Sequence, residues 1–263
     1  MSMTPEVPEQ PPEVAVSRDK ANWASPVSKL KVGDLPPGAL NMNVEGRKVM
    51  SPIQGFGKMW QKTYKVKVGP EVTPQELIET WKQNFPMFWP KNNFFYGPLT
   101  GIAPGEVAVV NLSMPGKLKL STGVLVLYAD DESFTLMTPE GHMFAGWITF
   151  SAYDDGTGTT TAQAQVLMRA NDPVYEMGLT FGGHAKEDVF WAETLGNLAS
   201  HFGAAGAEVD TQLVCVDKKR QWKRAGNIAK NSAMRSGLYM AGAPFRAVAK
   251  PFKRSEAASN KHE

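Results

Sequence analysis

The chain has 263 residues, of which 42% are hydrophobic and 21% charged, so it can bury a sizeable core and is not a fully disordered protein. Its single cysteine, Cys215, excludes an internal disulfide and any multi-cysteine zinc or iron–sulfur site. The net charge of +2 is unevenly placed, because residues 207–263 form a basic segment and the remainder is mildly acidic.

The first 45 residues are rich in proline, which lacks the backbone donor that helix and sheet interiors need. We therefore expect residues 1–45 to be a flexible arm, with Trp23 and Leu30 able to dock on the body. The first ten residues carry no secretory signal pattern, and no apolar run approaches the ~20 residues of a membrane span. These observations predict a cytoplasmic protein.

The body begins with a strand and a helix. Residues 59–68 alternate apolar and polar side chains, which is typical of a half-buried strand. Thr73, Pro74 and Glu76 then form a helix start, with Thr73 as the cap and Glu76 completing a capping box. The apolar residues that follow share one helical face: Leu77, Ile78, Trp81 and Phe85.

Further strands follow at hairpin spacing, separated by turn residues. Their predicted ranges are 106–114, 117–129, 133–138, 142–151 and 159–170. This spacing predicts an antiparallel sheet, and Gly123 and Gly146 are candidate bend points for a curved one.

A second helix start lies at Asp172-Pro173, and Gly178 and Gly182 should interrupt the helix that follows. Residues 185–203 are more regular and predict a long helix. Its apolar stripe is Trp191, Leu195, Leu198 and Phe202. The order of elements predicts an α+β protein with two layers, and residues 208–216 are either one more strand or an extended tail.

This order, together with the segments 139–150, 154–158 and 169–173, resembles the START-like helix-grip superfamily, which includes polyketide cyclases and Bet v 1-like proteins. It is similar to an uncharacterised domain-of-unknown-function branch of that superfamily. The resemblance implies a curved antiparallel sheet wrapped around a long C-terminal helix over residues 57–206. It also implies a hydrophobic cavity between the sheet and that helix.

Large or soft side chains are the best candidates for a ligand-binding lining, because apolar pockets are typically lined this way with a few polar groups. The candidates are Trp60, Tyr64, Trp81, Phe85, Phe88, Trp89, Asn111, Trp147, Met168, Met177, Phe181 and Trp191. Asn111 stands mid-strand among valines, where an inward side chain needs a partner. The alternative is that these residues interlock as a solid core.

We expect the protein to bind or carry a hydrophobic or amphipathic small molecule of the lipid, polyketide or isoprenoid class. One alternative is a cyclase- or hydratase-like enzyme that uses His184, Glu176 or Asp172 as general acid or base. Another is a structural or partner-binding module without a cavity. No histidine pair has metal-ligand spacing and no nucleotide-binding motif is present, so we expect neither a metal nor a cofactor.

The basic C-terminal extension, residues 207–263, has three interpretations: a solvated tail, a segment on a membrane, or a nucleic-acid contact. Aromatic residues interspersed among its lysines and arginines favour contact of residues 217–254 with an anionic membrane over contact with nucleic acid. The protein would then be peripheral at the membrane. The sequence leaves the oligomeric state open.

Overall fold

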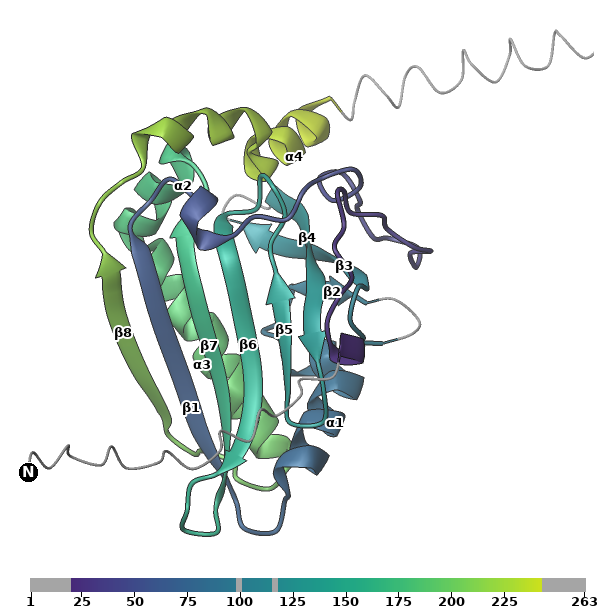
Figure 1. The fold of residues 1–263 in the computed structure, drawn as a ribbon, viewed down its shortest axis with the longest axis vertical. Coiled ribbons are helices and arrows are strands. Elements are labelled where there is room, and N and C mark those ends of the chain that lie inside the picture. Colours follow the sequence, from purple (N-terminus) through teal and green to yellow (C-terminus); the bar gives the residue numbers. More distant parts are fainter. Residues whose placement is uncertain (1–19, 98–100, 115–117, 243–263) are drawn as a thin grey trace, which may run out of the picture.

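A curved, eight-stranded antiparallel sheet and a long helix form the two main layers of the protein (Figure 1). The structure is a computed structural model, and it describes residues 20–97, 101–114 and 118–242. The strand order is β2-β3-β4-β5-β6-β7-β1-β8. The strands are β1 (Met59–Gly69), β2 (Phe94–Tyr96), β3 (Val107–Met114), β4 (Leu118–Ala129), β5 (Ser133–Met137), β6 (Phe144–Asp154), β7 (Thr160–Ala170) and β8 (Val209–Asp217).

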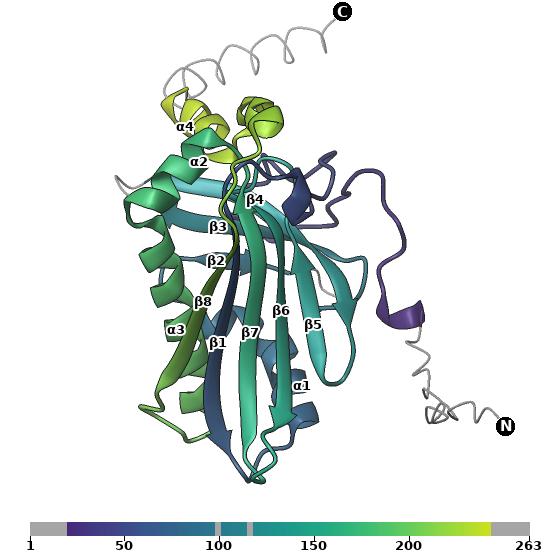
Figure 2. The ribbon, with the colours of Figure 1, turned by 60° about the vertical axis from the view of Figure 1, so that its left-hand side comes forward.

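Helices cover one face and one end of this sheet. The α-helices are α1 (Pro74–Asn84), α2 (Pro173–Gly178), α3 (His184–His201) and α4 (Ser232–Ala241). The 3-10 segments are η1 (Lys20–Asn22), η2 (Pro52–Gln54), η3 (Phe85–Phe88) and η6 (Trp222–Lys230), and the π-helical segment η5 (Leu179–Gly183) joins α2 to α3. Figure 2 shows α3 lying along the concave face. The expected α+β helix-grip fold, a curved antiparallel sheet around a long C-terminal helix, is therefore confirmed.

The main core lies between the concave face and the helices α1 and α3. Trp81 of α1 is fully buried, and its ring meets those of Phe134 and Phe150 edge to face. Leu195 and Leu198 of α3 are also fully buried, which confirms the predicted stripe. The capping box that starts α1 is present, because the Thr73 hydroxyl accepts from Glu76 N at 3.2 Å and the Glu76 carboxylate accepts from Thr73 N at 3.0 Å.

The N-terminal segment lies against the convex face over β3 and β4 (Figure 2). Leu30 and Val44 are buried against Val109 and Leu125 of the sheet. Gly123 permits this contact, because a Cβ there would lie 2.8 Å from the Val44 side chain. The described residues 20–45 of the predicted N-terminal arm thus lie on the body, whereas residues 1–19 lie outside the described part.

The break between α2 and α3 is where the glycines predict it. Asp172 caps α2 by accepting from Val174 N at 2.9 Å and Tyr175 N at 3.1 Å. The helix is interrupted at Phe181 and Gly182, where Gly182 takes a φ of +97° that favours glycine. The result is a wide turn in the helical layer directly above the sheet.

The chain beyond residue 206 packs on the body as far as it is described. Of the two alternatives for residues 208–216, the strand is correct, since β8 pairs with β1 along its length. The buried Arg169 joins this strand to the body through an ion pair with Asp217 and bonds to the carbonyls of Gly57 and Lys219. Farther along, Ser236 of α4 accepts a hydrogen bond from Ser121 N at 3.2 Å.

Candidate functional site

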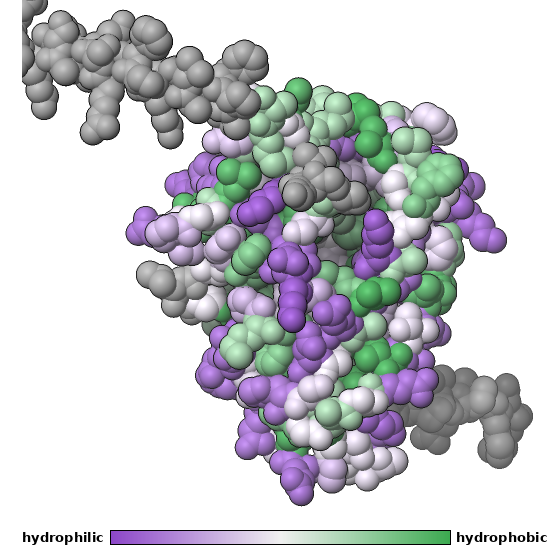
Figure 3. Space-filling model, turned by 180° about the vertical axis from the view of Figure 1, so that it is seen from behind, coloured by the Kyte–Doolittle hydropathy of each residue, from purple (hydrophilic) through white to green (hydrophobic). Residues whose placement is uncertain are grey.

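An apolar cavity of about 600 Å³ lies between the concave face of the sheet and the α2–η5–α3 layer. A row of inward residues on neighbouring strands forms its floor, since Leu136 of β5 pairs with Ile148 of β6 and Ile148 pairs with Val166 of β7. Phe190 and Trp191 of α3 form part of its roof. Seen from behind, the surface is hollowed in its upper half (Figure 3). The interior is thus not completely filled by its own side chains.

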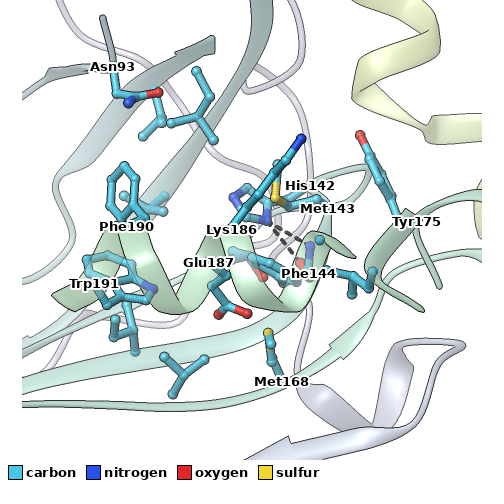
Figure 4. A pocket seen from close by; sticks show the side chains of 18 of the residues that line it. Asn93, His142, Met143, Phe144, Met168, Tyr175, Lys186, Glu187, Phe190 and Trp191 are labelled. Carbon is cyan, nitrogen blue, oxygen red and sulfur yellow. Dashed lines mark hydrogen bonds between the residues drawn. The ribbon is translucent and has the colours of Figure 1, made fainter. Parts of the chain in front are cut away.

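The mouth of the cavity carries exposed apolar side chains. Phe181, at the break in the helix, is 83% exposed and lines the cavity, as does the exposed Val189 of α3. Polar residues that line the cavity include the buried His142 and Tyr175 and the exposed Lys186, shown with the roof residues in Figure 4. A cavity of this volume and lining matches the size and character of small-molecule sites in proteins.

A buried charged cluster adjoins the apolar floor. Lys62 of β1 is 1% exposed and pairs across the sheet with Val166, so it lies at the end of the row of floor residues. Its ammonium donates to Glu187 Oε2 at 2.8 Å, to Asp188 Oδ1 at 2.7 Å and to the His184 carbonyl at 3.5 Å. The Tyr64 hydroxyl also donates to Asp188 Oδ1, at 2.7 Å.

One cation therefore faces two carboxylates, and Glu187 lines the cavity. Burial raises the pKa of Glu187 to about 7, although Lys62 opposes this shift. Burial, with a further contribution from Lys62, lowers the pKa of His184 to about 4. Burial likewise lowers the pKa of His142 to about 4, and its Nδ1 accepts from Phe144 N at 3.0 Å.

Five of the twelve candidate lining residues border this cavity. They are Trp89, Trp147, Met168, Phe181 and Trp191. Trp147 borders it beside Gly146, and the strand alternation places its side chain on the opposite face from Ile148. Met168 lies on the floor, with Glu187 above it in the close view (Figure 4).

The structure places the other candidates elsewhere. Trp81, Phe85 and Phe88 lie in the packed core under α1 and η3. Trp60 packs against the His184 ring, and the buried Tyr64 belongs to the Lys62 cluster. Met177 is exposed on α2.

Asn111 has its partner within the chain. Its side chain accepts from Leu40 N at 3.0 Å and donates to the Leu40 carbonyl at 3.1 Å, so it holds the N-terminal segment and does not face the cavity.

The three candidates for a general acid or base, Asp172, Glu176 and His184, each contact polar groups of the protein. Asp172 caps α2 and accepts from Asn231 at 2.8 Å, and Glu176 accepts from Arg220 at 2.8 Å. His184 lies beside Glu187, at 4.0 Å between Nδ1 and Oε2.

Lys62 and Glu187, the charged pair at the cavity, were not among the candidates predicted from the sequence. A signal was available, because Lys62 falls on the same face of its strand as Trp60, Tyr64 and Val66, and a lysine at a core position requires buried acceptors. Over the described ranges, no group of three or more histidine, cysteine or acidic side chains is placed to hold a metal ion.

No protein-family model matches the chain, and no curated protein is significantly similar to it. Among solved structures, it is similar to a START superfamily protein from Mycobacterium smegmatis, at 19% identity over 56% of this chain and 98% of that chain, with a TM-score of 0.38. The aromatase/cyclase StfQ of the steffimycin biosynthetic pathway matches at 8% identity over 55% of this chain and 50% of that chain, with a TM-score of 0.42. Norcoclaurine synthase from Thalictrum flavum matches at 12% identity, over 55% and 93% of the two chains, with a TM-score of 0.40.

Proposed function

We propose that this protein binds a hydrophobic or amphipathic small molecule in the cavity between the sheet and α3. The observation that carries the proposal is the apolar-lined cavity of about 600 Å³. Burial of apolar ligand surface in the cavity contributes about 25 cal/mol of favourable binding free energy per Å². A mostly apolar ligand therefore needs few directed polar contacts. The lipid, polyketide and isoprenoid classes fit this description.

Titration with the neutral fluorophore N-phenyl-1-naphthylamine tests this function. We expect saturable binding of about one molecule per chain, since the fluorophore is within the size range of ligands that such cavities take. Ile148→Trp should weaken this binding by narrowing the cavity, because Ile148 is an inward floor residue.

The matched control is Leu167→Trp. Leu167 neighbours Val166 on β7, and successive strand residues point to opposite faces, so the added ring lies outside the cavity. Binding should be retained in this variant. Equal binding by both variants would refute the cavity as the site.

We further propose that residues 217–254 contact an anionic membrane surface and bring the cavity to it. Support comes from the described residues 217–242. Trp222 of η6 and Leu238 of α4 are 73% and 74% exposed, and Lys218 and Lys223 are exposed close by in the chain. Figures 1 and 2 both place η6 and α4 at the same end of the molecule as α2. Exposed aromatic and basic side chains together are typical of peripheral membrane contact.

Among the described helices, none has the length and apolar character to cross a membrane. Flotation with vesicles of phosphatidylserine and phosphatidylcholine tests the peripheral contact. Lys218→Glu combined with Lys223→Glu should reduce flotation at low salt. The matched pair Lys31→Glu and Lys91→Glu, exposed lysines elsewhere, should have little effect. Equal flotation of both double variants and the parent protein would contradict the proposal.

A further inference from the structure

A buried carboxylate oxygen in the cavity wall has no partner within the described part of the chain. Glu187 Oε2 accepts from Lys62, but Oε1 is buried and accepts from no described group. Lys62 cannot satisfy it as well, because its three hydrogens already point to Glu187 Oε2, Asp188 and the His184 carbonyl. Buried polar atoms without a partner are rare in native proteins, and each calls for an explanation such as a water or a ligand.

The position of this oxygen suits a ligand. The Glu187 side chain is 6% exposed and lines the cavity, whose remaining walls are largely apolar. A second buried and unpartnered atom, His184 Nδ1, lies 4.0 Å from Glu187 Oε2. Figure 4 shows the Glu187 carboxyl group between the α3 backbone and Met168 of the floor. A molecule that fills the cavity therefore lies beside a residue of α3 whose buried carboxyl oxygen has no partner among the described residues.

The chemistry of the carboxyl group selects the ligand group. With a pKa raised by burial to about 7, Glu187 is populated both as acid and as carboxylate near neutral pH. A carboxylate accepts hydrogen bonds only, whereas the acid can also donate one. A ligand hydroxyl can donate to the first form and accept from the second, so it satisfies Glu187 in either state. A ketone or an ether satisfies only the acid, and a bare hydrocarbon satisfies neither.

We propose that Glu187 is the polar anchor of the cavity, and that the ligand is an apolar alcohol or phenol whose hydroxyl group hydrogen-bonds to Glu187 Oε1. This inference rests on the proposed function, because it concerns the same cavity. The inference narrows the ligand class from any apolar molecule to an apolar molecule that carries a hydroxyl group.

Binding of 2-naphthol and naphthalene to the full chain tests this proposal. The preference for 2-naphthol is defined as the ratio of the naphthalene Kd to the 2-naphthol Kd. Glu187→Leu should reduce this preference about tenfold, which is the loss expected for one buried hydrogen bond to a carboxyl group. The control is Glu193→Leu. Glu193 also borders the cavity from α3 but is exposed, so this variant should keep the parent preference.

A second measurement needs no variant that might unfold. In difference infrared spectra of the parent protein labelled with ¹³C-glutamate, the carboxyl bands of one glutamate should shift when 2-naphthol binds and not when naphthalene binds. Binding of both compounds with a preference unchanged in Glu187→Leu, or identical carboxyl bands with both, would overturn the anchor and leave the cavity function standing. Binding of neither compound would refute the proposed function itself, and the anchor with it.

Discussion

Removal of the Lys62 ammonium should destabilise the protein far more than removal of an exposed lysine on the same strand. Lys62→Met leaves two carboxylates, Glu187 and Asp188, in place without their cation. Loss of one partner of a buried ion pair costs about 3–5 kcal/mol. Because Glu187 can take up a proton near neutral pH, and because the Asp188 side chain is 23% exposed, we expect a loss at the lower end, about 3 kcal/mol.

The control is Lys67→Met. Lys67 pairs with Asp155 at 2.8 Å, but its side chain is 70% exposed, and solvent screening leaves exposed ion pairs with little effect on stability. Urea unfolding of both variants at pH 7 gives the free energies of unfolding, and equal slopes validate the comparison. Adding Glu187→Leu to Lys62→Met should recover part of the loss, since it removes one uncompensated charge. Ordinary surface substitutions change the free energy of unfolding by at most about 0.5 kcal/mol. If the free energies of unfolding of Lys62→Met and Lys67→Met differ by less than this, Lys62 behaves as a surface lysine and the buried cluster is refuted.

Three further outcomes follow from individual contacts. Burial lowers the pKa of His142 from its ordinary value of 6.5 to about 4 in the folded protein. As the pH drops from 6.5 to 4, the unfolded chain therefore takes up a proton at this residue before the folded protein does. The free energy of unfolding should fall by up to about 3 kcal/mol over this range. Urea unfolding across this range should show that part of the loss disappears in His142→Asn, and an identical pH dependence would refute the assignment. Leu30→Ala should cost about 2–5 kcal/mol in the free energy of unfolding, because Leu30 is buried under the convex face, whereas a flexible arm would show almost no change. Gly141→Ala should accelerate hydrogen exchange of the α4 amides, because Gly141 has a φ of +85° and a Cβ there would collide with the Lys230 carbonyl just before α4; unchanged exchange would show that this contact does not hold α4.

The elements with strong local signals could be predicted from the sequence. Thr73, Pro74 and Glu76 specify the start of α1 through hydrogen bonds within one turn, so no tertiary information is needed. Alternation and turn residues likewise located β3 to β7 to within a few residues. The short strand β2 was missed, since its three residues are too few to show a period.

The residues of the site could not be predicted in the same way. They are set by which side chains the fold brings together, and local sequence patterns carry little of that information. Aromatic residues fill a solid core and line a cavity equally well, so Trp81 and Trp191 could not be distinguished before the sheet curvature was known. Lys62 and Glu187 are 125 residues apart in the chain, and only the packing of α3 on β1 joins them. Asn111 was predicted to line the ligand site, but its side chain bonds to the backbone of Leu40 and does not border the cavity.

Methyl NMR of the full chain during titration with N-phenyl-1-naphthylamine tests the central claim most directly. We predict that the methyl resonances of Leu136, Ile148 and Val166 shift together and saturate, because these side chains form the cavity floor. The resonances of Leu30 and Val44, on the opposite face of the sheet, should stay in place. Shifts confined to surface methyl groups such as those of Ile53, or no shifts at all, would contradict an open apolar cavity.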